Sequence, residues 1–312
     1  IFSHDPLTTT TCFRHPKGRA DMPLSKSCFA YGAAAGFAAG AAAGIGLAHL
    51  WTPSFCSPKK SGISLLYWNG RGLMEVPRMM LAMAGMFPGD YENRKFWGEA
   101  KGSIEPVSAI EDQMDANFGR MPILKVGDVS IGQSVAINYY IAKATGLLGS
   151  SVLEAAQILS IQEHLTELGK AYRDVFPYMG PPPTEEALED FFTQGAEDYA
   201  GKADGSKRAE RKMKWFVKRL EGVVGEDGFA VGGKPSMADV LIYRTFGETI
   251  PLDQTTLEEK SQYKTEPFGS KAKMDRLLGE CPKLKAIIDK VESNPGIKKW
   301  LEIRCKDDKY AF

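Results

Sequence analysis

A strand that turns sharply into a helix is encoded around residue 70, and it constrains the fold more than any other stretch. Ile63 to Trp68 are apolar and aromatic with β-branching, which predicts a short buried strand. The run Asn69-Gly70-Arg71-Gly72 ends this strand, because its glycines permit the tight backbone of a strand-to-helix corner. Apolar residues then recur three and four apart, at Val76, Met79, Met80 and Met83, which predicts a helix from Leu73 onward.

Tyr67 lies at the end of this strand and is expected to point at the N-terminus of the following helix. A phenol flanked by helix N–H groups and by Arg71 is well placed to hydrogen-bond an anion. The structural alternative is a buried tyrosine that only closes the strand, beside an arginine that only caps the corner. The sequence therefore offers Tyr67 as a candidate anion-binding residue.

The composition is that of a globular protein and excludes several classes of function. Of 312 residues, 43% are hydrophobic and 25% are charged, which allows one large or two ordinary domains. The net charge is zero, so a nucleic-acid partner is not expected. The five cysteines show no CxxC motif and no zinc-like spacing with histidine, so we expect free thiols and no metal.

The first 60 residues form an extension that differs from the rest of the chain. They carry six Lys or Arg against two Asp, an excess of four positive charges. The uncharged stretch from Phe29 to Trp51 holds ten Ala and five Gly, and is long enough to span a bilayer. A stripe of small residues on one helix face would let membrane protein partners approach closely; it comprises Gly32, Gly36, Gly40 and Gly44.

Three interpretations of residues 29–51 remain open: a retained single membrane helix, a targeting signal cut near Ala48, or an Ala/Gly-rich linker. Retention predicts a membrane-anchored protein of an organelle, with chloroplast and mitochondrion as the alternatives. Removal of the segment predicts a cytoplasmic protein.

Beyond the extension, the patterns predict a small α/β domain over residues 61–147. Strands are predicted at Asp90 to Phe96, Met121 to Val126 and Val129 to Ile131, the last two as a hairpin. A helix follows from Gln133 and Ser134 to about Ala144, closed by Gly146.

The remainder, residues 150–312, is predicted to be all-helical. A long helix has an apolar stripe between Ile158 and Val175. Further helices are predicted at Glu185 to Ala200, Ser206 to Val224, from the capping box Ser236 to Asp239, Lys283 to Glu292 and Gly296 to Arg304.

Several short motifs in this order resemble the soluble glutathione transferases, closest to the sigma-like, Tyr-type group. The resemblance covers about residues 63–312. It is carried by Tyr67 to Gly72 with Glu75 and Arg78, Gly119 to Pro122, Gln133-Ser134, Ser236 to Asp239, Cys281 to Leu284, and Asn294 to Ile297. It implies the glutathione transferase fold, an α/β plus all-α architecture with a thioredoxin-like domain before an all-helical one.

The resemblance also implies glutathione as co-substrate and a set of residues that bind it. Tyr67 would donate a hydrogen bond to the glutathione thiolate, and Arg71 would add positive potential. Met121, before a cis Pro122, would pair through its backbone with the cysteinyl part, and Gln133 and Ser134 would bind the γ-glutamyl carboxylate. Further contacts are implied for Trp97, for Arg120 in place of the usual Gln, and for Glu163 of the partner subunit in a homodimer.

Two functions remain in view. The first is a glutathione transferase that activates the glutathione thiol for attack on an electrophile. The alternative is a non-catalytic accessory subunit, anchored by a membrane helix in a larger membrane complex, and it rests on the glycine stripe. It also rests on two apparent insertions relative to the family, from Asp90 to Phe118 and from Glu248 to Asp275.

Overall fold

The structure is a computed structural model, and it describes residues 62–98, 104–177, 180–195, 211–248 and 266–306. The predicted membrane segment at 29–51, with its stripe from Gly32 to Gly44, lies outside these residues, and so does the accessory-subunit alternative that depends on it. Within the described residues, no helix is long and apolar enough to cross a membrane.

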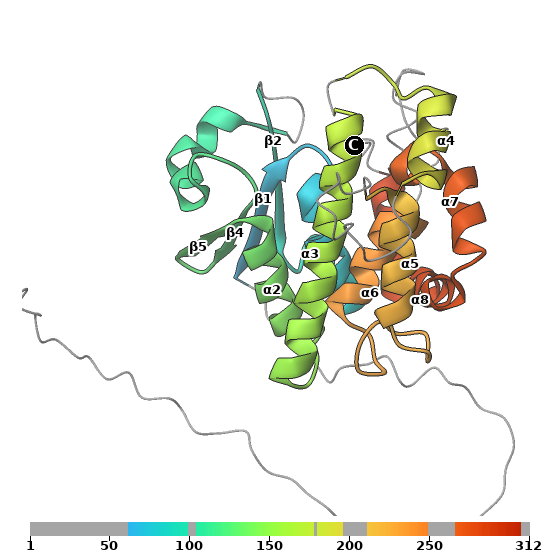
Figure 1. The fold of residues 1–312 in the computed structure, drawn as a ribbon. Coiled ribbons are helices and arrows are strands. Elements are labelled where there is room, and N and C mark those ends of the chain that lie inside the picture. Colours follow the sequence, from blue (N-terminus) through green and yellow to red (C-terminus); the bar gives the residue numbers. More distant parts are fainter. Residues whose placement is uncertain (1–61, 99–103, 178–179, 196–210, 249–265, 307–312) are drawn as a thin grey trace, which may run out of the picture. The chain divides into compact units, whose positions relative to one another are not determined.

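A five-stranded mixed sheet forms the core of the N-terminal domain, with the strand order β3-β2-β1-β4-β5 (Figure 1). β1 (Ile63–Trp68) pairs in parallel with β2 (Glu92–Trp97) and antiparallel with β4 (Ile123–Val126). β4 forms the predicted hairpin with β5 (Val129–Gly132), and the two-residue β3 (Glu105–Pro106) extends β2. The predicted thioredoxin-like order is therefore confirmed, with β3 as an edge strand that the sequence patterns missed.

Opposite faces of the sheet are covered by different elements, because neighbouring residues of a strand point to opposite sides. Leu65 packs into the large core that includes α1 (Glu75–Met83) and α2 (Ser134–Ala144). Its neighbour Leu66 packs into a second cluster that includes Ile110 of the 3-10 segment η3 (Val107–Asn117). Part of the predicted Asp90 to Phe118 insertion is thus the cover for one face of the sheet.

The second domain is helical, as predicted, and its long helix α3 runs from Val152 to Val175 (Figure 1). The elements that follow are α4 (Glu185–Thr193), α5 (Met213–Val223), α6 (Met237–Ile242), the π-helical turn η4 (Tyr243–Gly247), η7 (Pro267–Gly269), α7 (Lys271–Leu278), α8 (Pro282–Ser293) and α9 (Pro295–Lys306). The predicted capping box is present, since the Ser236 N–H donates to Asp239 Oδ2 at 2.7 Å.

Three helix predictions need correction. The helix predicted to reach Ala200 ends at Thr193, because Gln194 is extended and Gly195 has a positive φ. The helix predicted from Ser206 has no helical residue before Met213 in the described chain, since Lys212 is an extended N-cap. α7 was missed because its residues fell within or beside the segment interpreted as an insertion.

The last helix joins the two domains through a close backbone contact. α9 packs against α1, and a Cβ added to Gly296 would lie 2.1 Å from the carbonyl oxygen of Ala82. Only glycine permits this approach. The Asn294 side chain caps α9 by accepting hydrogen bonds from the N–H groups of Gly296 and Ile297, at 2.9 and 3.1 Å.

Candidate active site

The strand-to-helix corner holds the Tyr67 hydroxyl against the backbone. The Leu73 N–H, in the turn η2 (Gly72–Met74) that leads into α1, donates a hydrogen bond of 3.2 Å to the Tyr67 oxygen. A Cβ on Gly72 would lie 2.4 Å from the same oxygen, and Gly72 has a φ of +39°. Glycine is therefore required at this position by both the backbone conformation and the tyrosine ring.

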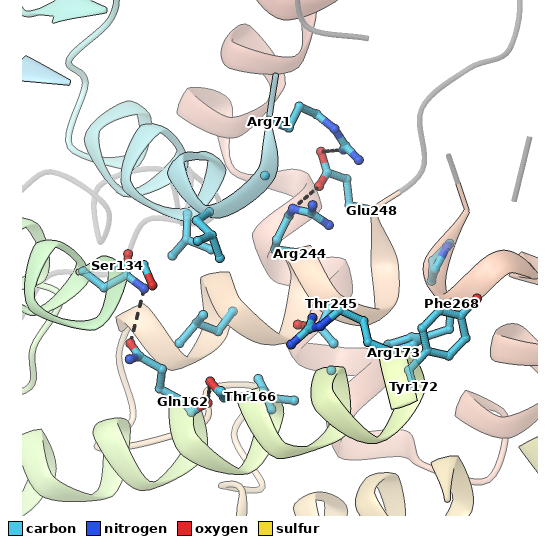
Figure 2. A pocket seen from close by; sticks show the side chains of 18 of the residues that line it. Arg71, Ser134, Gln162, Thr166, Tyr172, Arg173, Arg244, Thr245, Glu248 and Phe268 are labelled. Carbon is cyan, nitrogen blue, oxygen red and sulfur yellow. Dashed lines mark hydrogen bonds and ion pairs between the residues drawn. The ribbon is translucent and has the colours of Figure 1, made fainter. Parts of the chain in front are cut away.

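Beside this corner, the two domains enclose a cavity of about 430 Å³ (Figure 2). The N-terminal domain contributes Arg71, Gly72, Leu73 and Val76 from the corner and Ser134, Val135 and Asn138 from α2. The helical domain contributes α3 residues from Gln162 to Phe176, residues around Arg244 and Glu248, and the turn from Glu266 to Gly269. Tyr67 lies directly behind Gly72 and Leu73, two residues of the cavity wall.

The N-terminus of α2 forms a second functional corner of the cavity. Gln133 has a φ of +64°, and its N–H donates to Asn117 Oδ1 at 2.9 Å. The Asn117 amide nitrogen donates in turn to the carbonyl oxygen of Pro122 at 2.8 Å. The Met121–Pro122 peptide is cis, as the family resemblance implied. Buried Asn117 thus ties the start of α2 to the Pro122 loop and fixes their relative position.

Opposite α2, the buried Glu248 carboxylate holds three arginines. It lies 2.9 Å from Arg71 Nη1 and 3.2 Å from Arg244 Nε, and it also contacts Arg304 Nη1 (Figure 2). Arg304 continues the network to Glu75 of α1 at 2.6 Å, where Trp300 Nε1 also donates at 3.0 Å. One carboxylate therefore joins the corner of the N-terminal domain to the wall of the helical domain.

Burial and charge oppose each other in this network. Burial favours the neutral acid at Glu248, but Arg71, Arg304 and Arg244 outweigh it and lower the pKa of Glu248 to about 2. Burial lowers the pKa of the Arg71 guanidinium to about 10, against the attraction of Glu248. Both groups therefore remain charged at neutral pH, and Arg71 contributes a buried positive charge beside the cavity.

Comparisons with known proteins agree with this architecture. The family model described as "Glutathione S-transferase, C-terminal domain" matches residues 189–304. The chain is 26% identical to probable glutathione S-transferase 5 of Caenorhabditis elegans over 77% of its own length and 95% of the relative's. It is 27% identical to the hematopoietic prostaglandin D synthase of Gallus gallus, with 78% and 96% of the two chains covered.

These matches support the assignment of the chain to the glutathione transferase family. Its fold is also that of a solved nematode-specific glutathione transferase from C. elegans, with a TM-score of 0.52 at 24% identity, covering 78% of this chain and 96% of the solved one.

The residues predicted to bind glutathione fall into two groups. Arg71 and Ser134 line the cavity, with Tyr67 directly behind its wall. The others do not line it: Met121 and Pro122 are buried at the start of β4, Gln133 precedes α2, and Arg120, Glu163 and Trp97 are exposed. Trp97, at the end of β2, is 59% exposed. Their assignment to glutathione remains a prediction from the family resemblance.

Sequence reasoning missed Asn117, Arg244 and Glu248. The only local signal was the spacing of Arg244 and Glu248, four residues apart, which suits an ion pair on a helix. Glu248 was instead interpreted as the first residue of an insertion. Nothing local indicates Asn117, because its two partners, Pro122 and Gln133, come together only through the fold.

Proposed function

We propose that this protein is a glutathione transferase that binds glutathione between the strand-to-helix corner and the N-terminus of α2. The observation that carries this proposal is the Tyr67 hydroxyl, which accepts a hydrogen bond from the N–H of Leu73, a residue of the cavity wall. In this position the enzyme would ionise the glutathione thiol and add the sulfur to an electrophilic second substrate.

The Tyr67 hydroxyl is oriented to donate. Its oxygen accepts the Leu73 N–H, and no acceptor for its own proton is found among the described residues. A phenol that accepts one hydrogen bond donates a stronger one, because neighbouring bonds polarise each other. Donation to a thiolate is charge-assisted, and each unit by which it lowers the thiol pKa requires about 1.4 kcal/mol. Arg71 adds positive potential. Only 4% of this residue is exposed, so solvent screens its charge weakly.

The α2 N-terminus supports the other end of the proposed ligand. Ser134 is the first residue of α2 and lines the cavity. Helix N-termini present unpaired N–H groups and a partial positive charge, which suits the γ-glutamyl carboxylate. Asn117 holds the Pro122 loop in register with this helix end, so the two predicted halves of the glutathione site have a fixed separation.

Two variants of the full chain test the proposal. Calorimetric titration should show glutathione binding in the micromolar-to-millimolar range, weakened roughly tenfold in Ser134→Ala, which removes a charge-assisted hydrogen bond. Tyr67→Phe should keep the affinity but raise the pKa of bound glutathione, followed by the ultraviolet absorbance of the thiolate. The rate of conjugation at neutral pH should fall by about the same factor as the thiolate fraction of bound glutathione.

Two results would contradict the proposal. If no binding were detected at millimolar glutathione, glutathione would be excluded as the ligand of this site. An unchanged thiol pKa in Tyr67→Phe would remove the proposed catalytic role of the hydroxyl.

A further inference from the structure

Arg244 presents an unused pair of nitrogens to the cavity. Its Nε lies 3.2 Å from Glu248 Oε2, and 28% of its side chain is exposed. Within the described chain, its terminal nitrogens have no hydrogen-bond or ion-pair partner. Figure 2 shows the Arg244 guanidinium beside the cavity, with a dashed line joining it to the Glu248 carboxylate. A planar fork of this kind matches the two oxygens of a carboxylate.

The orientation of Arg244 is built into the fold. In the π-helical turn η4, the Glu248 N–H donates to the Tyr243 carbonyl at 2.9 Å, and Glu248 is fully buried. Gly247 packs so closely on α8 that a Cβ there would lie 2.5 Å from Ile288 Cγ2. Glu248 is thereby fixed, and it fixes Arg244 through Nε.

Arg173 supplies a second cation from a different helix. It is exposed near the end of α3 and lines the same cavity. Within the described chain it has no carboxylate partner. Besides Glu248, the described cavity wall contains the acidic residue Glu266, whose Oε2 accepts a hydrogen bond from the Lys271 N–H at 2.7 Å at the start of α7.

Arg244 shares its carboxylate with two other arginines. Glu248 also pairs with Arg71 at 2.9 Å and contacts Arg304. An anion in the cavity would give the Arg244 guanidinium a second negative partner, and low solvent exposure would strengthen the attraction.

The rest of this wall is extended and has an aromatic end. Cavity-lining residues run from Gln162 on α3 to Phe176 just after this helix, about 21 Å at a rise of 1.5 Å per residue, and they include the polar Thr166. Tyr172 and Phe268 meet edge to face, with ring centroids 5.1 Å apart, beside Phe176. A ligand that follows this wall needs an elongated body that is apolar where it meets these rings.

We propose that Arg244 and Arg173 form an anion-binding subsite for the second substrate, an elongated apolar electrophile that ends in a carboxylate. The identification of the ligand as a second substrate rests on the proposed transferase function. The subsite belongs to the helical wall, whereas the residues expected to bind glutathione belong to the N-terminal domain.

A matched pair of ligands tests the subsite in the full chain. The first is benzylideneacetone that carries a ring carboxylate, and the second is its methyl ester. Their dissociation constants are measured at neutral pH without glutathione, so the result does not depend on turnover. Wild type should bind the carboxylate roughly tenfold more tightly than the ester, since a charged hydrogen-bonded pair is gained.

Variants then assign the preference to residues. Arg244→Gln should abolish most of the preference for the carboxylate over the ester. Arg244→Lys keeps the charge but lacks the paired guanidinium nitrogens, and it should retain part of this preference. Arg173→Gln should cause a smaller loss, and it concerns an exposed residue whose removal leaves the core intact. Lys143→Gln is the charge-matched control, because Lys143 is exposed at the end of α2 and is not a cavity residue.

Three results would overturn the proposal. Equal affinity of wild type for the carboxylate and the ester would exclude the subsite, whether or not the protein conjugates glutathione. An equal loss in Lys143→Gln would show an effect of net charge alone. Displacement of the carboxylate probe by S-methylglutathione would assign the arginines to glutathione instead of a second substrate.

Discussion

On the N-terminal side of the cavity, the functional groups are helix N–H groups and a hydroxyl, held by turns of the backbone. On the helical side they are the side chains of Arg244, held by the buried Glu248 carboxylate, and of Arg173. Tyr67 depends on its neighbours Gly72 and Leu73, whereas Arg244 depends on Glu248, which in turn pairs with Arg71 from the other domain. The first wall is therefore held by local backbone turns, and the second by an ion pair between the two domains.

The largest effect is expected from removing the carboxylate that joins the two walls. Glu248→Gln leaves Arg71, Arg244 and Arg304 without their shared partner in a buried site. Breaking a buried ion pair on one side costs about 3–5 kcal/mol, so the free energy of unfolding should fall by that amount in urea denaturation. Glu280→Gln, which removes an exposed pair with Lys218, is the control and should change it by less than about 1 kcal/mol. Equal effects of the two variants would contradict the central position of Glu248.

Acidification should weaken the same connection in the unmodified protein. The pKa of Glu248 is about 2 in the folded state, below its ordinary 4.5, so between these values the unfolded state binds more protons. Stability from this group is therefore complete above pH 4.5 and is lost as the pH falls toward 2, by on the order of 3 kcal/mol. Unfolding curves across this range should show a steeper decline for wild type than for Glu248→Gln. Parallel curves would contradict the assignment.

A smaller and more local effect is expected on the other wall. Gly72→Ala places a Cβ 2.4 Å from the Tyr67 oxygen at a positive φ, and should cost about 2 kcal/mol and weaken glutathione binding. Gly85→Ala is the matched control, since Gly85 also has a positive φ but open space around its Cβ position. Gly85→Ala should lower the free energy of unfolding by about 1 kcal/mol and leave glutathione binding unchanged. Equal loss of binding in both would show that Tyr67 is not displaced.

The same contrast explains what could be predicted from the sequence. The corner from Leu65 to Arg78, the hairpin and the capping box at Ser236 all have signals within a few residues, and the structure confirms them. The cis Pro122 was implied by the family resemblance, and it is also confirmed. The boundaries of α4 and α5 failed because polar helical periodicity continues past Gln194 and begins before Met213, where the backbone is extended. The Arg71–Glu248 pair could not be predicted, because its partners lie in different domains and no local pattern links them.

The contact of α9 with α1 also bears on how the protein is made. Arg304 follows Glu75 by 229 residues, and ribosomes add roughly 5–20 residues per second, so the partner of Glu75 arrives on the order of ten seconds or more later. Until then the nascent N-terminal domain lacks Trp300 and Arg304, which complete the surroundings of Glu75, and the Gly296 backbone that packs on Ala82. The thioredoxin-like half of the molecule is translated before the helical half, but its final contacts are supplied by α9 of the helical half.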